Sequence, residues 1–239
     1  ESIQLPKHLR QDVADLPKAA RQMTTNKWHQ WIVANNQWKG AVQGYLASLS
    51  FADDMVGELL SALDDGPLAS NTTIILWGDH GYHLGEKQHW ENFALWENTT
   101  RVPLIVVSPE NTVPKTRCDT PVSLLDLYPT LVEVCDLQSP PQTLEGKSFL
   151  NLLKKPGSEQ ERVAITTQGK NNHAVRSRQH RYIRYADGSE ELYDHKHDPH
   201  EWTNLATDNQ YAEIKKHLAS LMPSLNRDPL LQPKKSDTN

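Results

Sequence analysis

The stretch 72–90, TTIILWGDHGYHLGEKQHW, opens as an apolar strand and then changes abruptly to glycine, acid and histidine. Its first six residues are β-branched or apolar on both faces, which predicts a buried parallel strand lying between helices. The predicted strand ends at Gly78, directly before Asp79 and His80. Because ligands of open α/β sheets gather outside the carboxyl ends of the strands, this position favours a functional site.

Helix and strand signals alternate around this stretch. Apolar residues recur at helical spacing from 35 to 63 and predict a long amphipathic helix, which Gly66 and Pro67 end. A second strand signal, RVPLIVVSP at 101–109, precedes a predicted helix over 123–135. The order helix, strand, strand, helix indicates an α/β layer architecture.

The pattern changes beyond about Pro156. Short alternating strands follow, with ADGSE at 186–190 as a hairpin turn, and a last helix is predicted over 210–222. These signals predict a small antiparallel sheet with a helix. We therefore expect two parts, a core part over residues 1–155 and a small C-terminal α+β part over residues 156–239.

Composition limits the class of protein. The 239 residues could bury a sizeable core, and the formal net charge is -5. No apolar run approaches the roughly 18 residues that would span a bilayer, so we expect no membrane span. Basic residues form only a short run at 176–184, so nucleic acid is not an expected partner.

Two further features concern the ends of the chain and its redox chemistry. Residues 1–20 have no periodic apolar face, no initiating methionine and no apolar signal core. They predict an extended surface connection in a chain whose true N-terminus is missing. Cys118 and Cys135 match neither a Cys-x-x-Cys pair nor a metal-ligand spacing, so one bridge and two buried thiols both remain open.

The segment GDHGYHLGEKQHW, followed by TRVPLIV, resembles the second conserved block of the sulfatases. The resemblance is greatest to the iduronate-2-sulfatase-like and choline-sulfatase-like branch. Segments 44–65, 122–135 and 181–206 resemble the same family, so the resemblance covers nearly the whole chain. It implies an alkaline-phosphatase-like α/β sandwich, of which this sequence supplies the second part, with a small C-terminal antiparallel sheet.

The resemblance also implies a sulfuric ester hydrolase that acts on a sulfated carbohydrate or another sulfate ester. In such enzymes Ca²⁺, held by acids from both halves of the domain, polarises the sulfate while a formylglycine hydrate attacks sulfur. Asp79 and His80 match the second-half metal ligands, and Tyr82 falls where a side chain borders the substrate pocket. Without the resemblance, an isolated Asp-His pair would be read as a turn cap beside a buried histidine.

The nucleophile is not expected in this chain. Formylglycine forms from a cysteine followed by x-(Pro/Ser)-x-Arg, and neither Cys118 nor Cys135 begins that motif. The resemblance places the nucleophile and the first metal-binding aspartates in the missing N-terminal part of the same domain. The isolated chain is therefore expected to be inactive. Asp53 and Asp54 lie inside the predicted helix, where a solvated or helix-packing role is expected.

Asn92 and Lys87 affect how much positive charge the expected substrate pocket can offer to a sulfate. Relatives of this branch place a lysine that contacts the sulfate where this chain has Asn92, and an asparagine cannot neutralise an anion. Lys87 either compensates by turning inward or is a solvated lysine. The resemblance therefore predicts weaker binding of sulfate than in relatives that have the lysine.

Four more side chains are candidate substrate-binding residues, and each also has a plain structural interpretation. His83 and His89 either line the pocket and exchange a proton with the leaving group, or lie on the surface. His173 and Arg176 either bind a sugar or its carboxylate, or provide strand-surface polarity. In the segment ELYDHKHDPHEWTNL, Tyr193 and Trp202 are expected to pack the small C-terminal part against the core.

Two other functions remain open. One is a phosphodiesterase or phosphonate hydrolase of the same superfamily, which would use a serine or threonine in place of formylglycine. The other is a truncated protein that binds a cation or glycan without catalysis. The missing nucleophile and Asn92 favour the second of these.

Overall fold

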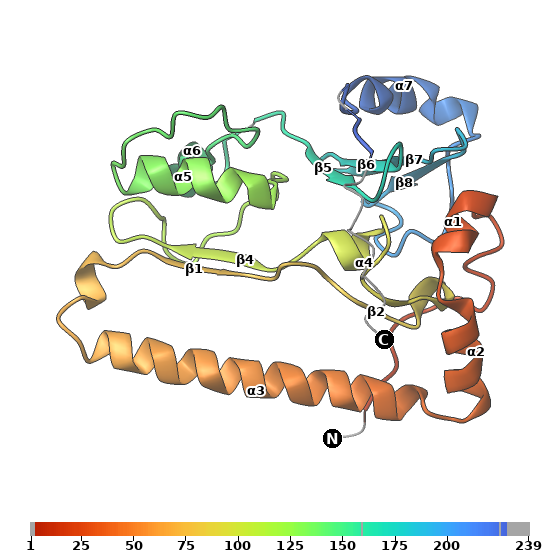
Figure 1. Ribbon diagram of the computed structural model, residues 1–239, viewed down its shortest axis with the longest axis horizontal. Helices are drawn as coiled ribbons and strands as arrows, with labels where there is room; N and C mark the ends of the chain where they lie inside the picture. Colours follow the sequence, from red (N-terminus) through yellow and green to blue (C-terminus); the bar gives the residue numbers. More distant parts are fainter. Residues whose placement is uncertain (1–2, 159, 225, 229–239) are drawn as a thin grey trace, which may run out of the picture.

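The computed structural model describes residues 3–158, 160–224 and 226–228 (Figure 1). The helices are α1 (Lys18–Met23), α2 (Asn26–Ala34), α3 (Trp38–Asp64), α4 (Glu97–Thr100), α5 (Leu127–Val134), α6 (Leu150–Lys154) and α7 (Ala212–Ser220). The strands are β1 (Ile74–Trp77), β2 (His83–Leu84), β3 (Trp90–Glu91), β4 (Leu104–Val107), β5 (Ala164–Thr167), β6 (His173–Arg176), β7 (His180–Arg184) and β8 (Glu190–Asp194). Short 3-10 turns, η1 to η4, cover Ala69–Asn71, Glu86–Gln88, Leu124–Asp126 and Asn209–Tyr211.

β1 pairs with β4 in an antiparallel ladder that runs from Ile74 opposite Val107 to Trp77 opposite Leu104. The prediction of a buried parallel strand over 72–77 is therefore wrong. The connection between the two strands folds into the β2–β3 hairpin and α4, and it returns the chain in the opposite direction. An apolar, β-branched run carries no information about the direction of its partner strand, so the sequence could not reveal this.

One face of the β1–β4 pair is packed and the other is half exposed. Ile75, Leu104 and Val106 pack against a cluster formed by Leu127, Phe149 and Leu152 of the α5–α6 region. On the opposite face, Leu76, Ile105 and Val107 are 39%, 53% and 48% exposed. The pair is thus buried on one side, as is common for antiparallel ladders.

The predicted helix over 35–63 is confirmed as α3, and the amide of Gly66 closes its end on the carbonyl of Leu63. Its apolar side chains remain largely at the surface, since Val42 is its one buried residue among those described. Residues 1–20 depart from the expected surface connection. Leu16 and Ala20 are 2% and 0% exposed in a core cluster with Trp96. Two apolar side chains are too few to form a periodic signal.

The small antiparallel sheet predicted beyond residue 156 is confirmed, with strand order β5-β6-β7-β8. Its hairpin turn is closed by the Tyr185 amide donating to the Ser189 carbonyl at 2.9 Å, and Gly188 has φ 84°. α7 covers one face of the sheet, where Leu218 joins Val175 and Tyr182 in a core cluster. α5 and α7 also confirm the predicted helices over 123–135 and 210–222.

Cys118 is half buried and Cys135 is exposed, and both are free. The structure thus rules out the bridge, and it also rules out the alternative of two buried thiols. Within the described part of the chain, no helix is long and apolar enough to cross a membrane.

Candidate functional site

Asp79 and His80 form an exposed turn directly after β1. Their side chains are 85% and 45% exposed. The His80 amide donates to Asp79 Oδ1 at 2.9 Å, and His80 Nδ1 contacts the Gly81 carbonyl at 2.9 Å. A carbonyl accepts only, so Nδ1 is the donor in this contact, and in the neutral imidazole Nε2 then offers a lone pair.

This turn has features of half a cation site. His80 Nε2 and Asp79 Oδ2 lie 3.6 Å apart, close to the separation of two donors that share one cation at about 2.3–2.6 Å from each. A metal-binding histidine commonly donates its other ring N–H to a backbone carbonyl, as His80 does to Gly81. The two residues fit a divalent cation, although Ca²⁺ takes about six to eight ligands and needs oxygens from elsewhere.

Tyr82 and Asn92 are half buried near this turn in the sequence. The Tyr82 ring packs against Tyr45 of α3, with ring centroids 5.5 Å apart. Burial, with the carboxylate of Glu91 nearby, raises the pKa of the Tyr82 hydroxyl, so it is a neutral hydrogen-bond donor at neutral pH. The Asn92 carbonyl accepts the Ala94 amide at 3.0 Å.

His83 and His89 are buried, at 1% and 0% exposure, and their rings lie 5.1 Å apart beside Trp96. The Thr25 amide donates to His89 Nδ1 at 3.1 Å. Among the described residues, neither ring nitrogen of His83 has a hydrogen-bond partner, and nor has His89 Nε2, although Glu86 Oε2 lies 4.0 Å from His83 Nδ1. Burial lowers the pKa of His83 to about 3 and of His89 to about 4. Both imidazoles are therefore neutral core groups.

These two histidines predict a loss of stability on mild acidification. The unfolded chain binds protons at these positions near pH 6.5 and the folded chain does not, so the free energy of unfolding falls as pH falls below 6.5. Each group contributes about 1.4 kcal/mol per pH unit. Between pH 7 and pH 5, we expect the free energy of unfolding of His83→Phe to fall by about 2 kcal/mol less than that of the wild type. Urea denaturation at each pH measures both values.

The control for this measurement is His200→Phe, the same substitution at an exposed histidine that stacks on Trp202 at 4.7 Å. Its pH dependence should follow that of the wild type. If His83→Phe and the wild type lose equal stability over this range, the buried His83 imidazole is not the acid-sensitive group.

Lys87 lies in the core, not at the surface, with an exposure of 3%. Its ammonium pairs with Asp12 Oδ1 at 3.0 Å and donates to the carbonyl of Glu201. Asp12 is itself 2% exposed. In this arrangement the lysine charge is neutralised within the core, so it does not supply a free cation for a substrate.

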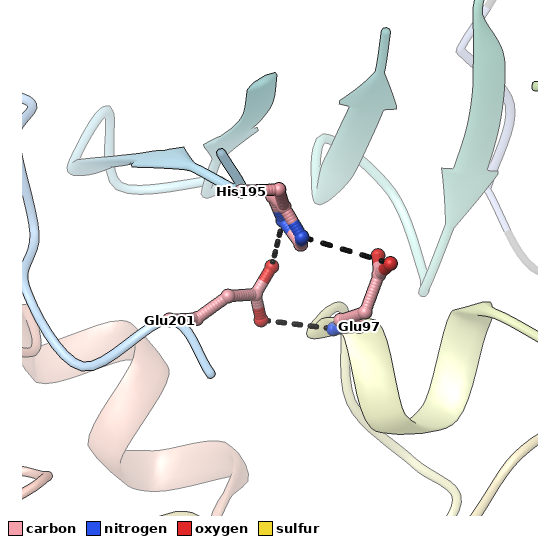
Figure 2. Close-up of side chains that lie close together, drawn as sticks. All are labelled: Glu97, His195 and Glu201. Atoms are coloured by element: carbon pink, nitrogen blue, oxygen red, sulfur yellow. Dashed lines mark hydrogen bonds and ion pairs between the residues drawn. The ribbon is translucent and has the colours of Figure 1, made fainter. Parts of the chain in front are cut away.

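A buried ion-pair cluster joins β7 and the loops around it to α4, and sequence reasoning missed it. Arg181, which is 1% exposed, pairs with Glu97 and with Glu201, whose Oε1 lies 2.6 Å from Arg181 Nε. Arg176 Nε donates to Glu97 Oε2 at 3.0 Å, and His195 Nε2 lies 3.0 Å from Glu201 Oε1 (Figure 2). We name these five residues the ion-pair cluster. Glu97 lies 79 and 84 residues before Arg176 and Arg181, so spacing gave no signal for the pairing.

Glu97, His195 and Glu201 each offer a donor atom within 4.8 Å of the other two, but they do not fit a metal ion. Arg181 and Arg176 already neutralise the carboxylates, and a dication would add charge beside two guanidinium groups. Burial acts to raise the pKa of Glu201, yet Arg181 and His195 hold it at about 2. The cavity that Glu97 and Glu201 help to line measures about 10 Å³, too small for a sugar.

His173 and Arg176 lie on β6 and are likewise engaged within the fold. His173 is 3% exposed, and its Nδ1 lies 2.8 Å from Thr167 Oγ1. Arg176 belongs to the ion-pair cluster. Of the predicted site residues, the structure places Asp79 and His80 together in the open, whereas His83, Lys87, His173 and Arg176 contact other protein groups or pack in the core.

A larger cavity, about 460 Å³, lies between the β7–β8 hairpin and α7 and is lined by Glu190, Asp208 and Lys215. Lys215 Nζ pairs with Glu190 Oε2 at 2.9 Å. Because these charges neutralise each other, the cavity offers no free cation for a sulfate, and we do not assign it to the site.

Two family models match the chain. One, described as Sulfatase, matches residues 6–137, and the other, described as N-sulphoglucosamine sulphohydrolase, C-terminal, matches residues 85–228. The chain is 40% identical over 230 residues to a sulfatase of Formosa agariphila, an overlap of 95% of this chain and 45% of that protein. It is 47% identical over 72 residues to the iduronate 2-sulfatase of Mus musculus, covering 30% of this chain and 13% of that protein.

The chain spans less than half the length of these relatives. Its fold resembles that of a phosphonate monoester hydrolase from Silicibacter pomeroyi, with a TM-score of 0.73 and 19% identity. That likeness covers 91% of this chain and 49% of the hydrolase. At this sequence identity the likeness shows a common fold only. It does not discriminate between hydrolysis of sulfate esters and hydrolysis of phosphonate esters.

Proposed function

The chain belongs to the sulfatase family, and from that premise we propose that it forms part of a sulfuric ester hydrolase acting on a sulfated carbohydrate. The family expected from the sequence is confirmed. The proposal rests on one observation above all: Asp79 and His80 project from an exposed turn after β1, with Nε2 and Oδ2 3.6 Å apart. Identity to a mouse iduronate 2-sulfatase supports an iduronate-2-sulfatase-like substrate.

Asp79 and His80 would hold Ca²⁺, with the remaining oxygens supplied by acids outside this sequence. A bound divalent cation neutralises the sulfate and polarises its oxygens. In the same proposal Tyr82, neutral and braced by Tyr45, borders the pocket and can donate a hydrogen bond to a sugar oxygen. The Asp79 side chain is 85% exposed, so its carboxyl oxygens are open to a cation.

The nucleophile is proposed to lie in a part of the whole protein that this sequence does not contain. Neither cysteine begins the motif for formylglycine, and the chain covers 45% of the Formosa agariphila sulfatase. The test is to sequence the coding DNA before the codon for Glu1. An Asp-Asp pair and Cys-x-(Pro/Ser)-x-Arg in frame are expected. A stop codon there would instead support the alternative, a protein that binds a cation or glycan without catalysis.

Sulfate and phosphonate chemistry can be separated by assay, since the fold serves both. We expect the complete enzyme to hydrolyse 4-methylumbelliferyl sulfate and a 2-sulfated uronic acid disaccharide faster than a phenyl phosphonate monoester. The sequence relatives favour sulfate. A higher kcat/KM for the phosphonate would establish the alternative hydrolase.

Replacing Asn92 by lysine should strengthen binding of the anionic substrate. A neutral amide gives way to an ammonium, and a charge-assisted hydrogen bond is about 1 kcal/mol stronger than a neutral one. We expect Asn92→Lys to lower KM for the sulfated disaccharide about fivefold to tenfold, with the gain shrinking at 0.5 M NaCl. Steady-state kinetics at two salt concentrations measure this.

The matched control is Asn209→Lys, the same substitution at an exposed residue of η4 on the α7 side of the molecule. It should leave KM unchanged. If Asn92→Lys leaves KM and its salt dependence as in the wild type, Asn92 does not face the sulfate.

A further inference from the structure

The turn that carries Asp79 and His80 rests directly on the backbone of α4. The Gly81 amide donates to the Thr99 carbonyl at 2.9 Å. A Cβ at residue 81 would lie 1.9 Å from the carbonyl oxygen of Asn98, so no larger residue fits without moving one of the two segments. The position of the turn is therefore set by the position of α4.

α4 has four residues and cannot hold its place by its own hydrogen bonds. Its first residue is fixed by the ion-pair cluster instead. The Glu97 amide donates to Glu201 Oε2 at 2.9 Å, and the Glu97 carboxylate binds Arg176 and Arg181. Arg181 Nη1 also donates to the Leu95 carbonyl at 3.1 Å, which fixes the chain just before the helix.

We propose that Glu97 is a positioning residue for the cation site, because it holds α4 against the C-terminal sheet and α4 in turn supports Gly81 beside Asp79 and His80. The inference rests on the proposed role of Asp79 and His80 as cation ligands. Figure 1 shows α4 between the β1–β4 pair and the C-terminal sheet. The C-terminal sheet thereby contributes to the site through Glu97 without reaching the cation.

Other contacts around α4 are consistent with this role. Thr99 Oγ1 donates to the carbonyls of Ala94 and Trp96, at 3.1 and 3.0 Å, and Thr100 Oγ1 donates to Trp96 at 3.0 Å. These bonds make α4 and the segment before it one unit. A shift of Glu97 is therefore passed to the carbonyls of Asn98 and Thr99, on which Gly81 rests.

The test is Glu97→Gln in the complete protein, which supplies the remaining cation ligands, with Asp126→Asn as the matched control. Glu97 and Asp126 are each 7% exposed and each pair with arginine, and both substitutions remove one negative charge. Asp126 lies at the junction of η3 and α5, where its carboxylate accepts the Ser123 amide at 2.9 Å, away from the turn. Ca²⁺ alone is titrated into each variant at a temperature where all are folded, and amide chemical shifts of residues 79–82 are followed. Hydrogen exchange of the Gly81 amide is measured without Ca²⁺.

We expect Glu97→Gln to raise the Kd for Ca²⁺ at least about tenfold, as changes to groups that orient metal ligands commonly do. It should also accelerate exchange of the Gly81 amide about tenfold, whereas Asp126→Asn should leave both values within about twofold of the wild type. Glu97→Asp, which keeps the charge, should recover part of the affinity.

Two failures can be told apart by including Asp79→Asn. If Asp79→Asn leaves the Ca²⁺-dependent shifts unchanged, or the wild type shows none, the assignment of the cation site falls and the inference with it. If Asp79→Asn weakens binding but Glu97→Gln changes neither Kd nor Gly81 exchange, Glu97 does not position the turn. Equal effects of Glu97→Gln and Asp126→Asn would also overturn the inference, because they would show a general loss of stability.

Discussion

Asp79→Asn is expected to lower kcat/KM of the complete enzyme for a sulfated disaccharide at least about 1000-fold. Several kcal/mol of transition-state stabilisation depend on a cation beside the sulfate, and each 1.4 kcal/mol is a factor of about ten in rate. Asparagine has nearly the shape of aspartate but no charge, so the turn after β1 should keep its conformation while its affinity for Ca²⁺ falls. His80→Asn should act in the same direction.

The controls are Asp53→Asn and Asp54→Asn, the same change at two exposed aspartates on α3. Each should keep kcat/KM within about twofold of the wild type, because an exposed carboxylate on a helix surface contributes little. Raising Ca²⁺ to 20 mM should partly restore Asp79→Asn if the loss is one of affinity. Activity within tenfold of the wild type for both Asp79→Asn and His80→Asn would show that the cation is held elsewhere.

Elements with a strong local period could be predicted from the sequence. α3 and the C-terminal hairpin follow from apolar spacing and from turn residues such as Gly188. The antiparallel pairing of β1 with β4 could not be predicted. The apolar side chains of β1 indicate that it is buried, but they do not indicate the direction of the neighbouring strand. The buried position of Leu16 was also missed, since it depends on contacts with residues near 95 and 183.

Asp79 and His80 could be proposed as cation ligands from the sequence because both lie in one short motif directly after a strand. The ion-pair cluster could not, because Glu97, Arg181 and Glu201 meet only after the chain folds. Lys87 shows the limit of reasoning by residue type. A lysine in a polar loop is commonly solvated, yet here Asp12, 75 residues earlier, draws it into the core. Long-range pairing of charges leaves no periodic pattern in the sequence.

The ion-pair cluster also carries the largest expected effect on stability. Arg181→Met should lower the free energy of unfolding by about 3–5 kcal/mol, because it leaves Glu97 and Glu201 buried without their shared partner. Methionine fills much of the volume of the arginine side chain, so the loss reports charge more than packing. Urea denaturation at pH 7 measures it. Adding Glu201→Gln should cost less in the Arg181→Met background than in the wild type, by at least about 1 kcal/mol.

Arg117→Met is the matched control, since Arg117 pairs with Asp119 at 2.9 Å but is 76% exposed. Its expected effect is below about 1 kcal/mol, because an exposed ion pair is screened by water and salt. A loss in Arg181→Met no greater than that in Arg117→Met would mean that Arg176 and His195 suffice to neutralise the two glutamates. In that case α4 would be held by Glu97 and Arg176 alone, and the affinity for Ca²⁺ should then be more sensitive to Arg176→Met than to Arg181→Met.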